Sequence, residues 1–231
     1  MPIITLTTDF GTKDHFVGAV KGAIYSELPN AKIVDITHQI SPFNITETAY
    51  ILKNSYKSFP DGTIHIIAVE SELRSTNMHI TLALDNHYFV CPDNGLICMI
   101  TKDIKPTKVV EINIHDRIES SFPVLDVFVQ VACFISRGGN LTVIGKETKS
   151  YKEMTEIQPK VSQDQKIITG GVIYIDNYGN IISNINKKIF TEIGKGRDFK
   201  ISAARYTFTK IIHKYNEILG DDATNVRQFD G

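Results

Sequence analysis

Acidic side chains flank a short glycine-containing segment near the start of the chain, Thr7-Thr8-Asp9-Phe10-Gly11-Thr12-Lys13-Asp14-His15. Asp9 and Asp14 are suited to closing a turn or capping a helix. An ionised carboxylate also accepts hydrogen bonds from the hydroxyl or ammonium groups of a polar ligand. Two carboxylates around one short loop favour a ligand site slightly over capping alone.

Three more polar segments follow apolar runs, namely His38-Gln39-Ile40-Ser41-Pro42-Phe43, Glu70-Ser71-Glu72 and Pro92-Asp93-Asn94-Gly95. Phe43 offers a flat apolar face for a ring, or else anchors its own loop. Glu70 either ends a strand or serves as an acid or base in a cleft. The whole set is acidic and aromatic and has no obvious phosphate clamp. This composition suits a cationic or nucleoside-like ligand.

The elements that position these loops alternate along the first part of the chain. Apolar, β-branched runs predict strands at 3–8, 33–36, 64–69, 80–84, 88–91 and 108–112, and the first two are expected to be buried. Apolar residues at helical spacing predict helices at 16–28, 44–57, 96–100 and 124–136. This order indicates an α/β fold, with a mostly parallel sheet flanked by helices. In such a sheet the four polar loops share the edge at the carboxyl ends of the strands.

Composition excludes several classes of protein. With 231 residues and 42% hydrophobic content, the chain can build a substantial core, and a net charge of −1 predicts neither a nucleic-acid nor a membrane partner. Cys91, Cys98 and Cys133 lack metal-type spacing and suit buried positions in a reducing compartment. Without a signal peptide or a long apolar run, we expect a soluble cytoplasmic protein. The seven histidines are scattered, so no metal site is expected.

The pattern changes after residue 150, which we take as the end of the N-terminal α/β domain. Residues 151–166 are polar and predict a linker, and residues 167–231 predict a small antiparallel β domain. Strands are expected at 167–175 and 181–185, with one or two more in 199–212. Leu219 to Gly231 has little apolar periodicity. The β domain is therefore expected to be an incomplete, apparently truncated barrel, or to need a partner for its open edge.

Five motifs occur in a characteristic order: Thr8-Asp9-Phe10-Gly11 with Lys21-Gly22, Val34-Asp35-Ile36-Thr37-His38, Phe59-Pro60-x-Gly62-Thr63, Pro92-Asp93-Asn94-Gly95-Leu96 and Ile175-Asp176-Asn177-Tyr178-Gly179-Asn180. This set resembles the S-adenosylmethionine (SAM) hydroxide adenosyltransferase family, which is related to the fluorinases and chlorinases. The resemblance implies an N-terminal α/β domain, a C-terminal β-barrel and a homotrimer that binds SAM between neighbouring subunits. It also implies hydrolysis of SAM to adenosine and methionine without a metal or cofactor.

The resemblance assigns roles to four residues of these motifs and loops. Asp9 would bind the ribose hydroxyls and Phe43 would stack on the nucleoside. Asp14 and Asp176 would hold the methionine end, where a carboxylate suits the ammonium group.

Three further residues complete the expected substrate-binding set. Asn180 would read the adenine edge, Tyr178 would line the pocket, and Asn94 belongs to the Pro-Asp-Asn-Gly-Leu motif.

The chain departs from the family pattern at the catalytic positions. Hydrolases of this family carry an Asp in an Asp-Pro-Gly-Val-Gly loop, an Arg seven residues later and a His in a Phe-His-Gly-Arg-Asp segment. Here these positions hold Glu70, Asn77 and Pro123. Glu70 is the expected catalytic residue, orienting water, and Glu72 or Arg74 could reach the same space. The alternatives are a protein that binds SAM or adenosine without turnover and a truncated, inactive fold.

Overall fold

A computed structural model describes residues 2–101, 104–114, 120–155, 157–212 and 226–227. The chain divides into two compact units, Met1–Glu156 and Ile157–Gly231. We consider each unit separately, and the domain boundaries expected at 150 and 166 remain predictions. Among the described residues no helix is both long and apolar enough to span a bilayer.

The first unit is built on one seven-stranded sheet in the order β2-β1-β3-β5-β4-β6-β7. Its strands are β1 (Ile3–Thr8), β2 (Lys32–Thr37), β3 (Ile64–Ala68), β4 (His79–Leu84), β5 (His87–Pro92), β6 (Lys108–Ile112) and β7 (Gly145–Glu147). The four strands β2, β1, β3 and β5 run parallel, whereas β4, β6 and β7 pair antiparallel with their neighbours. The predicted α/β class is confirmed, with a mixed sheet.

The parallel half of the sheet brings the predicted ligand loops to one edge. The loops after β1, β2, β3 and β5 all leave from the carboxyl ends of parallel strands. The antiparallel half starts at the β4–β5 hairpin, whose two turn residues Asp85 and Asn86 have φ of 51° and 61°. Positive φ at both positions is typical of a type I′ turn, which matches the twist of the flanking strands.

The prediction that residues 33–36 form a buried strand is wrong in one respect. The strand exists as β2, but Lys32, Val34 and Asp35 are exposed. β2 ends the strand order, and among the described residues it pairs only with β1, so one of its sides has no neighbouring strand there. An edge strand can therefore present charged side chains to solvent.

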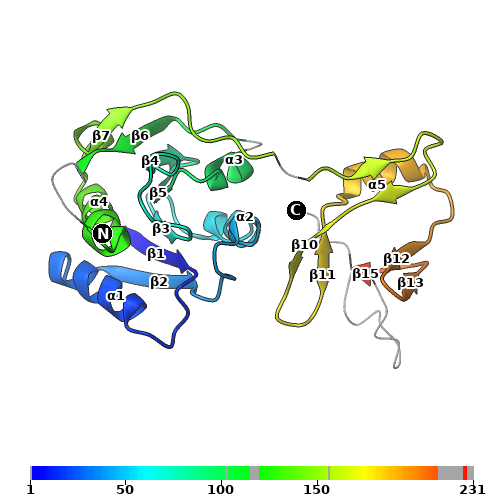
Figure 1. Cartoon of the computed structure of the whole chain (residues 1–231), viewed down its shortest axis with the longest axis horizontal. Helices are drawn as coiled ribbons and strands as arrows, with labels where there is room; N and C mark the ends of the chain where they lie inside the picture. The colour runs from blue at the N-terminus through cyan, green and yellow to red at the C-terminus, as the bar shows by residue number, and fades with distance from the viewer. Residues whose placement is uncertain (1, 102–103, 115–119, 156, 213–225, 228–231) are drawn as a thin grey trace. The chain divides into compact units, whose positions relative to one another are not determined.

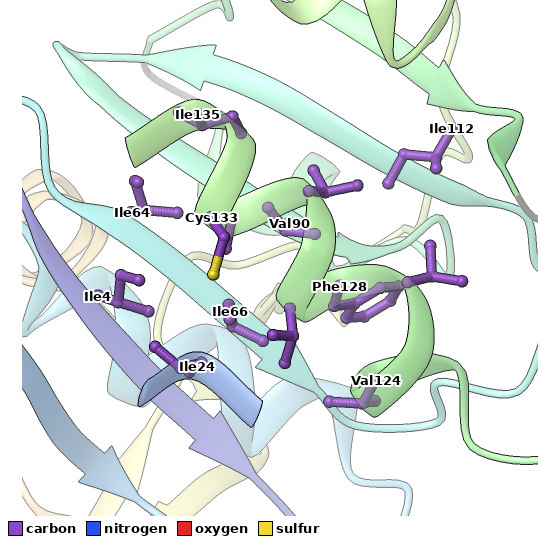
Figure 2. Close-up of a cluster of buried hydrophobic side chains, with 14 of the residues drawn as sticks. Ile4, Ile24, Ile64, Ile66, Val90, Ile112, Val124, Phe128, Cys133 and Ile135 are labelled. Carbon is purple, nitrogen blue, oxygen red and sulfur yellow. The ribbon is translucent and has the colours of Figure 1, made fainter. Parts of the chain in front are cut away.

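Helices cover both faces of the sheet (Figure 1). One face packs against α1 (Phe16–Glu27), a π-helical turn (Val124–Phe128) and α4 (Val129–Ser136). The other face packs against α2 (Ile45–Lys53), α3 (Leu96–Ile100) and the 3₁₀ turn η1 (Tyr56–Ser58). Figure 2 shows the first cluster, in which β-strand isoleucines meet Phe128 and Cys133. The predicted helix at 44–57 is shorter, because the helical pattern gives way to η1.

The described residues of the second unit form short pairs of strands and one helix. Its elements are β8 (Lys160–Val161), β9 (Ile168–Thr169), β10 (Val172–Ile175), β11 (Ile181–Ser183), α5 (Lys187–Gly194), β12 (Ile201–Ala203), β13 (Tyr206–Phe208), β14 (Ile211–Ile212) and β15 (Val226–Arg227). The predicted strand at 167–175 is split by Gly170-Gly171, and α5 was not predicted. Of the segment 219–231, all but residues 226–227 lies outside the described residues.

Candidate functional site

The loop after β1 places Asp9 against the loop after β2. Asp9 is half-buried, and its carboxylate Oδ2 accepts a hydrogen bond from the Phe43 backbone N–H at 3.0 Å. The backbone N–H of Asp9 donates to the carbonyl of Ala68, at the end of β3, at 3.4 Å. These bonds join the carboxyl ends of three strands. Asp9 and Phe43, predicted from sequence to share a site, are in direct contact.

Phe43 and Glu70 both adopt a left-handed backbone conformation, with φ of 62° and 50°. This conformation is uncommon for residues other than glycine and unusual for a bulky side chain. Residues held in this way concentrate at active sites and ligand clamps. The Phe43 side chain is 71% exposed at this edge, so it is available to a ligand.

The loop from Glu70 to Asn77 is closed by the residue that replaces the expected arginine. Asn77 is buried, and its Nδ2 donates to the carbonyls of Glu70 at 2.7 Å and Glu72 at 3.2 Å. The backbones of Arg74 and Asn77 also bond to each other in both directions. The side-chain amide of Asn77 therefore holds Glu70 in place by donating to the Glu70 backbone carbonyl. Arg74 pairs with Glu72, and both side chains are exposed.

Asn94 is engaged by backbone groups on both sides. It is 2% exposed; its Nδ2 donates to the carbonyl of Val69 at 3.1 Å and its Oδ1 accepts the Leu96 N–H at 3.2 Å. Asn94 thus ties the end of β3, just before Glu70, to the start of α3. Next to it, burial raises the pKa of Asp93, although that carboxylate accepts the Lys152 N–H at 2.8 Å.

Three aromatic rings that the sequence did not single out lie beside the Asp9 loop. Phe10, Phe16 and Phe122 contact one another with ring centroids 5.5–5.8 Å apart. Phe122 precedes the buried Pro123, so the segment that resembles Phe-His-Gly-Arg-Asp does reach this edge. Asp14 is exposed in the loop before α1. The presence of Phe10 in the first motif, next to Asp9, is the feature of the sequence that could have indicated this cluster.

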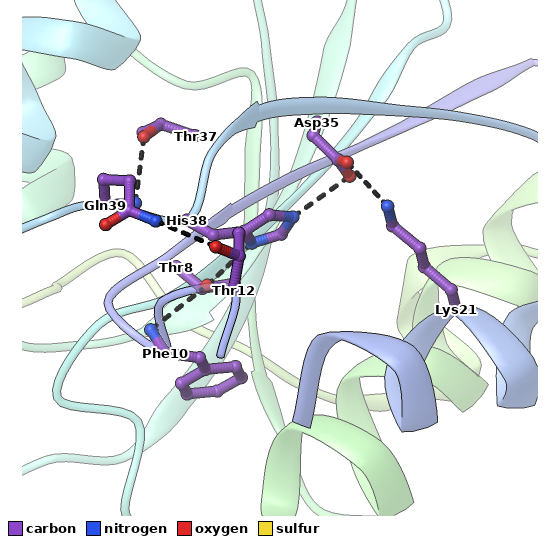
Figure 3. Close-up of polar contacts among 8 residues, drawn as sticks. All are labelled: Thr8, Phe10, Thr12, Lys21, Asp35, Thr37, His38 and Gln39. Carbon is purple, nitrogen blue, oxygen red and sulfur yellow. Dashed lines mark hydrogen bonds and ion pairs between the residues drawn. The ribbon is translucent and has the colours of Figure 1, made fainter. Parts of the chain in front are cut away.

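A chain of polar contacts runs from the surface to the Asp9 loop (Figure 3). Lys21 Nζ donates to Asp35 Oδ2 at 2.6 Å, and His38 Nε2 lies 3.1 Å from Asp35 Oδ1. His38 Nδ1 bonds to Thr8 Oγ1 at 2.8 Å. Partial burial acts to raise the pKa of Asp35, but the hydrogen bonds from Lys21 and His38 outweigh it and lower that pKa. The sequence motifs contained Lys21, Asp35 and His38 without indicating this connection.

The predicted binding residues of the second unit form one turn between β10 and β11. Asp176 Oδ1 accepts the N–H groups of Tyr178 at 2.9 Å and Asn180 at 2.8 Å. Asp176 Oδ2 accepts from Asn180 Nδ2 at 2.7 Å. The hydrogen bonds from Asn180 lower the pKa of Asp176, so the turn carries a negative charge at neutral pH. Tyr178 is 87% exposed at its tip.

The described part of the chain contains no cluster of three or more His, Cys, Asp or Glu side chains suited to a metal. Of the predicted buried cysteines, Cys91 and Cys133 are buried and Cys98 is partly exposed. Two hollows of about 400 and 700 Å³ lie elsewhere, beside α4 and at the β4–β5 turn, and neither is lined by Asp9, Phe43 or Glu70.

Two family profiles match the chain. Residues 4–145 match the SAM hydroxide adenosyltransferase N-terminal domain, and residues 170–223 match the C-terminal domain. A (R)-S-adenosyl-L-methionine hydrolase from Methanocaldococcus jannaschii is 34% identical over 194 residues, covering 81% of this chain and 68% of the relative. A fluorinase from an Actinoplanes species is 24% identical over 224 residues, covering 84% of this chain and 75% of the relative.

Among solved structures, a conserved protein of Thermotoga maritima described as uncharacterized aligns with a TM-score of 0.80 at 28% identity, covering 94% of this chain and 85% of that one. Three of the five motifs that suggested the resemblance, those that begin at Thr8, Val34 and Pro92, end in loops at the carboxyl edge of the sheet. The chain belongs to the SAM hydroxide adenosyltransferase family.

Proposed function

We propose that this protein hydrolyses SAM to adenosine and L-methionine. The observation that carries the proposal is the meeting of Asp9, Phe43 and the Glu70 loop at one sheet edge. A family relative that is 34% identical and named as a SAM hydrolase supports the same reaction.

The proposed reaction is a single displacement at the ribose C5′. A water oxygen forms a bond to C5′ while the bond from C5′ to the sulfonium sulfur breaks, and the sulfur keeps the electron pair as the thioether of methionine. Glu70 accepts the proton that water loses. Because the sulfonium is already a good leaving group, the protein has mainly to hold water in line and exclude other solvent.

The remaining residues of the first unit bind the substrate in this proposal. The Asp9 carboxylate, already fixed by the Phe43 N–H, has lone pairs left for the ribose hydroxyls. The exposed Phe43 ring stacks on the nucleoside. Asn77 supplies no charge at the family's arginine position, but it holds the carbonyl of Glu70. Asp14 completes the substrate-binding set of this unit. Asn94, predicted to bind substrate, is instead buried and bonded to backbone on both sides, so it acts by holding the end of β3 and the start of α3.

The second unit completes the site in a homotrimer. By the family resemblance, Asp176, Tyr178 and Asn180 of one copy would face the SAM-binding sheet edge of a neighbour. The apolar side chains around that turn support the proposal, since Ile175, Tyr178 and Ile181 are each more than half exposed within one chain. A metal-free reaction in the cytoplasm remains the prediction from sequence.

Chromatography of the protein incubated with SAM tests the reaction. We expect adenosine and methionine in equal amounts, and no product from Asp9→Ala. Glu70→Gln should lower kcat by about 10²- to 10⁴-fold, the usual contribution of a positioned acid or base, while SAM binding persists in calorimetry.

Glu72→Gln is the matched control, because Glu72 is an exposed neighbour paired with Arg74. It should keep the wild-type rate. Absence of adenosine from the wild-type protein would overturn the proposal. Equal losses in Glu70→Gln and Glu72→Gln would remove the catalytic role of Glu70.

A further inference from the structure

We propose that His38 is a positioning residue, which acts through Thr8 to hold the turn that carries Asp9. Asp35 and Lys21 in turn hold His38. This inference rests on the proposed function only for its effect on substrate, because the effect on the turn itself can be measured without a ligand.

The contacts around Thr8 carry the first step. Thr8 Oγ1 lies 2.8 Å from His38 Nδ1, and it also accepts the backbone N–H of Phe10 at 3.3 Å. Thr8 and His38 are 2% and 5% exposed, so water does not substitute for either partner. Asp9 lies between Thr8 and Phe10. The hydroxyl of Thr8 therefore closes a tight turn around Asp9.

The second step concerns the proton on His38. His38 Nε2 lies 3.1 Å from Asp35 Oδ1, an ion-pair distance without the alignment of a hydrogen bond. The negative charge of the carboxylate beside Nε2 favours a proton on that nitrogen. In the neutral imidazole, Nδ1 is then an acceptor and receives the Thr8 hydroxyl proton. The lone pairs of Thr8 Oγ1 remain free for the Phe10 N–H. The His38 imidazole thus orients the Thr8 hydroxyl so that its oxygen can accept the Phe10 N–H.

The third step is the fixation of the carboxylate. Lys21 Nζ, on α1, donates to Asp35 Oδ2 at 2.6 Å and leaves Oδ1 for His38. Figure 3 shows the resulting line of contacts from Lys21 to Phe10. Two backbone bonds support the same turn, from Gly11 N–H to the His38 carbonyl at 2.7 Å and from Ile40 N–H to the Thr8 carbonyl at 3.4 Å. These survive side-chain substitution, so loss of the imidazole should loosen the turn rather than unfold it.

The chain provides a matched control on the same strand. Thr5 Oγ1 bonds to His65 Nδ1 at 2.7 Å, and both residues are fully buried. This second threonine–histidine pair has no contact with the Asp9 turn in the described contacts. Substitutions at Thr5 and His65 therefore report the general cost of losing such a pair.

The ligand-free measurement is amide hydrogen exchange by NMR at a temperature where all variants are folded. In His38→Leu and Thr8→Val, the Phe10 amide should exchange about tenfold faster, because it loses an oriented acceptor. In His65→Leu and Thr5→Val it should keep its wild-type rate. An unchanged Phe10 amide in His38→Leu would overturn the positioning role.

The substrate measurement uses SAM and steady-state kinetics. Because Asp9 binds ribose in both ground and transition states, His38→Leu should raise KM about tenfold and change kcat by less than about threefold. The double variant with Thr8→Val should be no worse than His38→Leu alone. His38→Asn, whose Oδ1 replaces the Nδ1 acceptor, should recover most of the affinity. Additive losses or failure of His38→Asn to recover would overturn the inference.

Different results would contradict the proposed function and the proposed positioning role. If the wild-type protein forms no adenosine and binds no SAM, the proposed function fails, while faster exchange at Phe10 in His38→Leu still supports the positioning role. If SAM is hydrolysed and KM stays at the wild-type value in His38→Leu, the positioning role fails and the function stands.

Discussion

Two threonine–histidine hydrogen bonds start from β1, and their surroundings differ. Thr5 pairs with His65 on the neighbouring strand β3, and Thr8 pairs with His38 just after β2. The distances are nearly equal, 2.7 and 2.8 Å, and all four residues are buried. The bond itself therefore does not distinguish the two pairs.

Their neighbours do distinguish them. His65 packs against Phe89 and Tyr56, and its Nε2 bonds to His87 Nδ1 at 3.1 Å. Burial, helped by His87, lowers the pKa of His65 to about 3. His38 instead contacts the carboxylate of Asp35, which reaches solvent. The first pair is insulated within the core, and the second links a surface charge to a loop. One pair should govern stability and the other the geometry of the site.

The largest expected effect is on stability, in His65→Leu. This change leaves the hydroxyl of Thr5 and Nδ1 of His87 without their buried partner, which should cost about 2–4 kcal/mol of unfolding free energy. His38→Leu should cost about half of that. Urea unfolding of both variants makes the comparison. Equal losses would mean that the two pairs do not differ in role.

The second expected effect is on the acid dependence of stability. The folded-state pKa of His65, about 3, lies below the ordinary 6.5. The unfolded chain therefore takes up a proton first as pH falls, and the stability present above pH 6.5 is lost as pH falls towards about 3. Between pH 6.5 and pH 5 the loss should be about 2 kcal/mol.

Urea unfolding at several pH values measures this slope. His65→Leu should flatten it and leave a smaller slope from His87, whose pKa is also lowered by burial. A slope that persists unchanged in His65→Leu would contradict the assignment.

An intermediate case is Asn94→Ala, which affects both properties. Loss of the amide removes the donor to the Val69 carbonyl and should cost about 1–2 kcal/mol. Because Glu70 follows Val69, kcat for SAM should also fall. Asn54→Ala is the control, since Asn54 makes the same kind of bond, to the Tyr50 carbonyl, at an exposed helix end. Unchanged kcat in Asn94→Ala would separate Asn94 from the site.

The smallest effect on stability is expected for Phe43→Ala. The ring is 71% exposed, so unfolding free energy should change by less than about 0.5 kcal/mol. The KM for SAM should nevertheless rise about three- to tenfold through lost stacking. Tyr25→Ala, at an exposed ring on α1, should change neither quantity. A wild-type KM in Phe43→Ala would contradict the stacking role.

The sequence predicted the sheet well where apolar runs were continuous. β3, β4 and β5 were expected because most of their residues are apolar. The exposure of β2 was not expected, because the order of the strands in a sheet is set by tertiary pairing. α5 was missed because it is only eight residues long and buries no side chain in its own unit.

The sequence also predicted part of the candidate site. Asp9 and Phe43 were expected together because parallel strands bring their loops to one edge. The link between Asp35 and His38 was not visible, since residues three apart on a regular strand face opposite sides. Here the register of the β1–β2 pairing shifts between Leu6 and Thr7, because β2 has one extra residue between Asp35 and Thr37. Sequence spacing alone does not reveal such a shift.

The left-handed backbone at Phe43 and Glu70 has a further consequence. Glycine adopts this conformation freely, so Phe43 and Glu70 are held there by their neighbours, through the Asp9 carboxylate and the Asn77 amide. The two loops are thus shaped by contacts within the protein itself. A preshaped edge loses little conformational entropy on binding, so more of the contact energy is available as affinity.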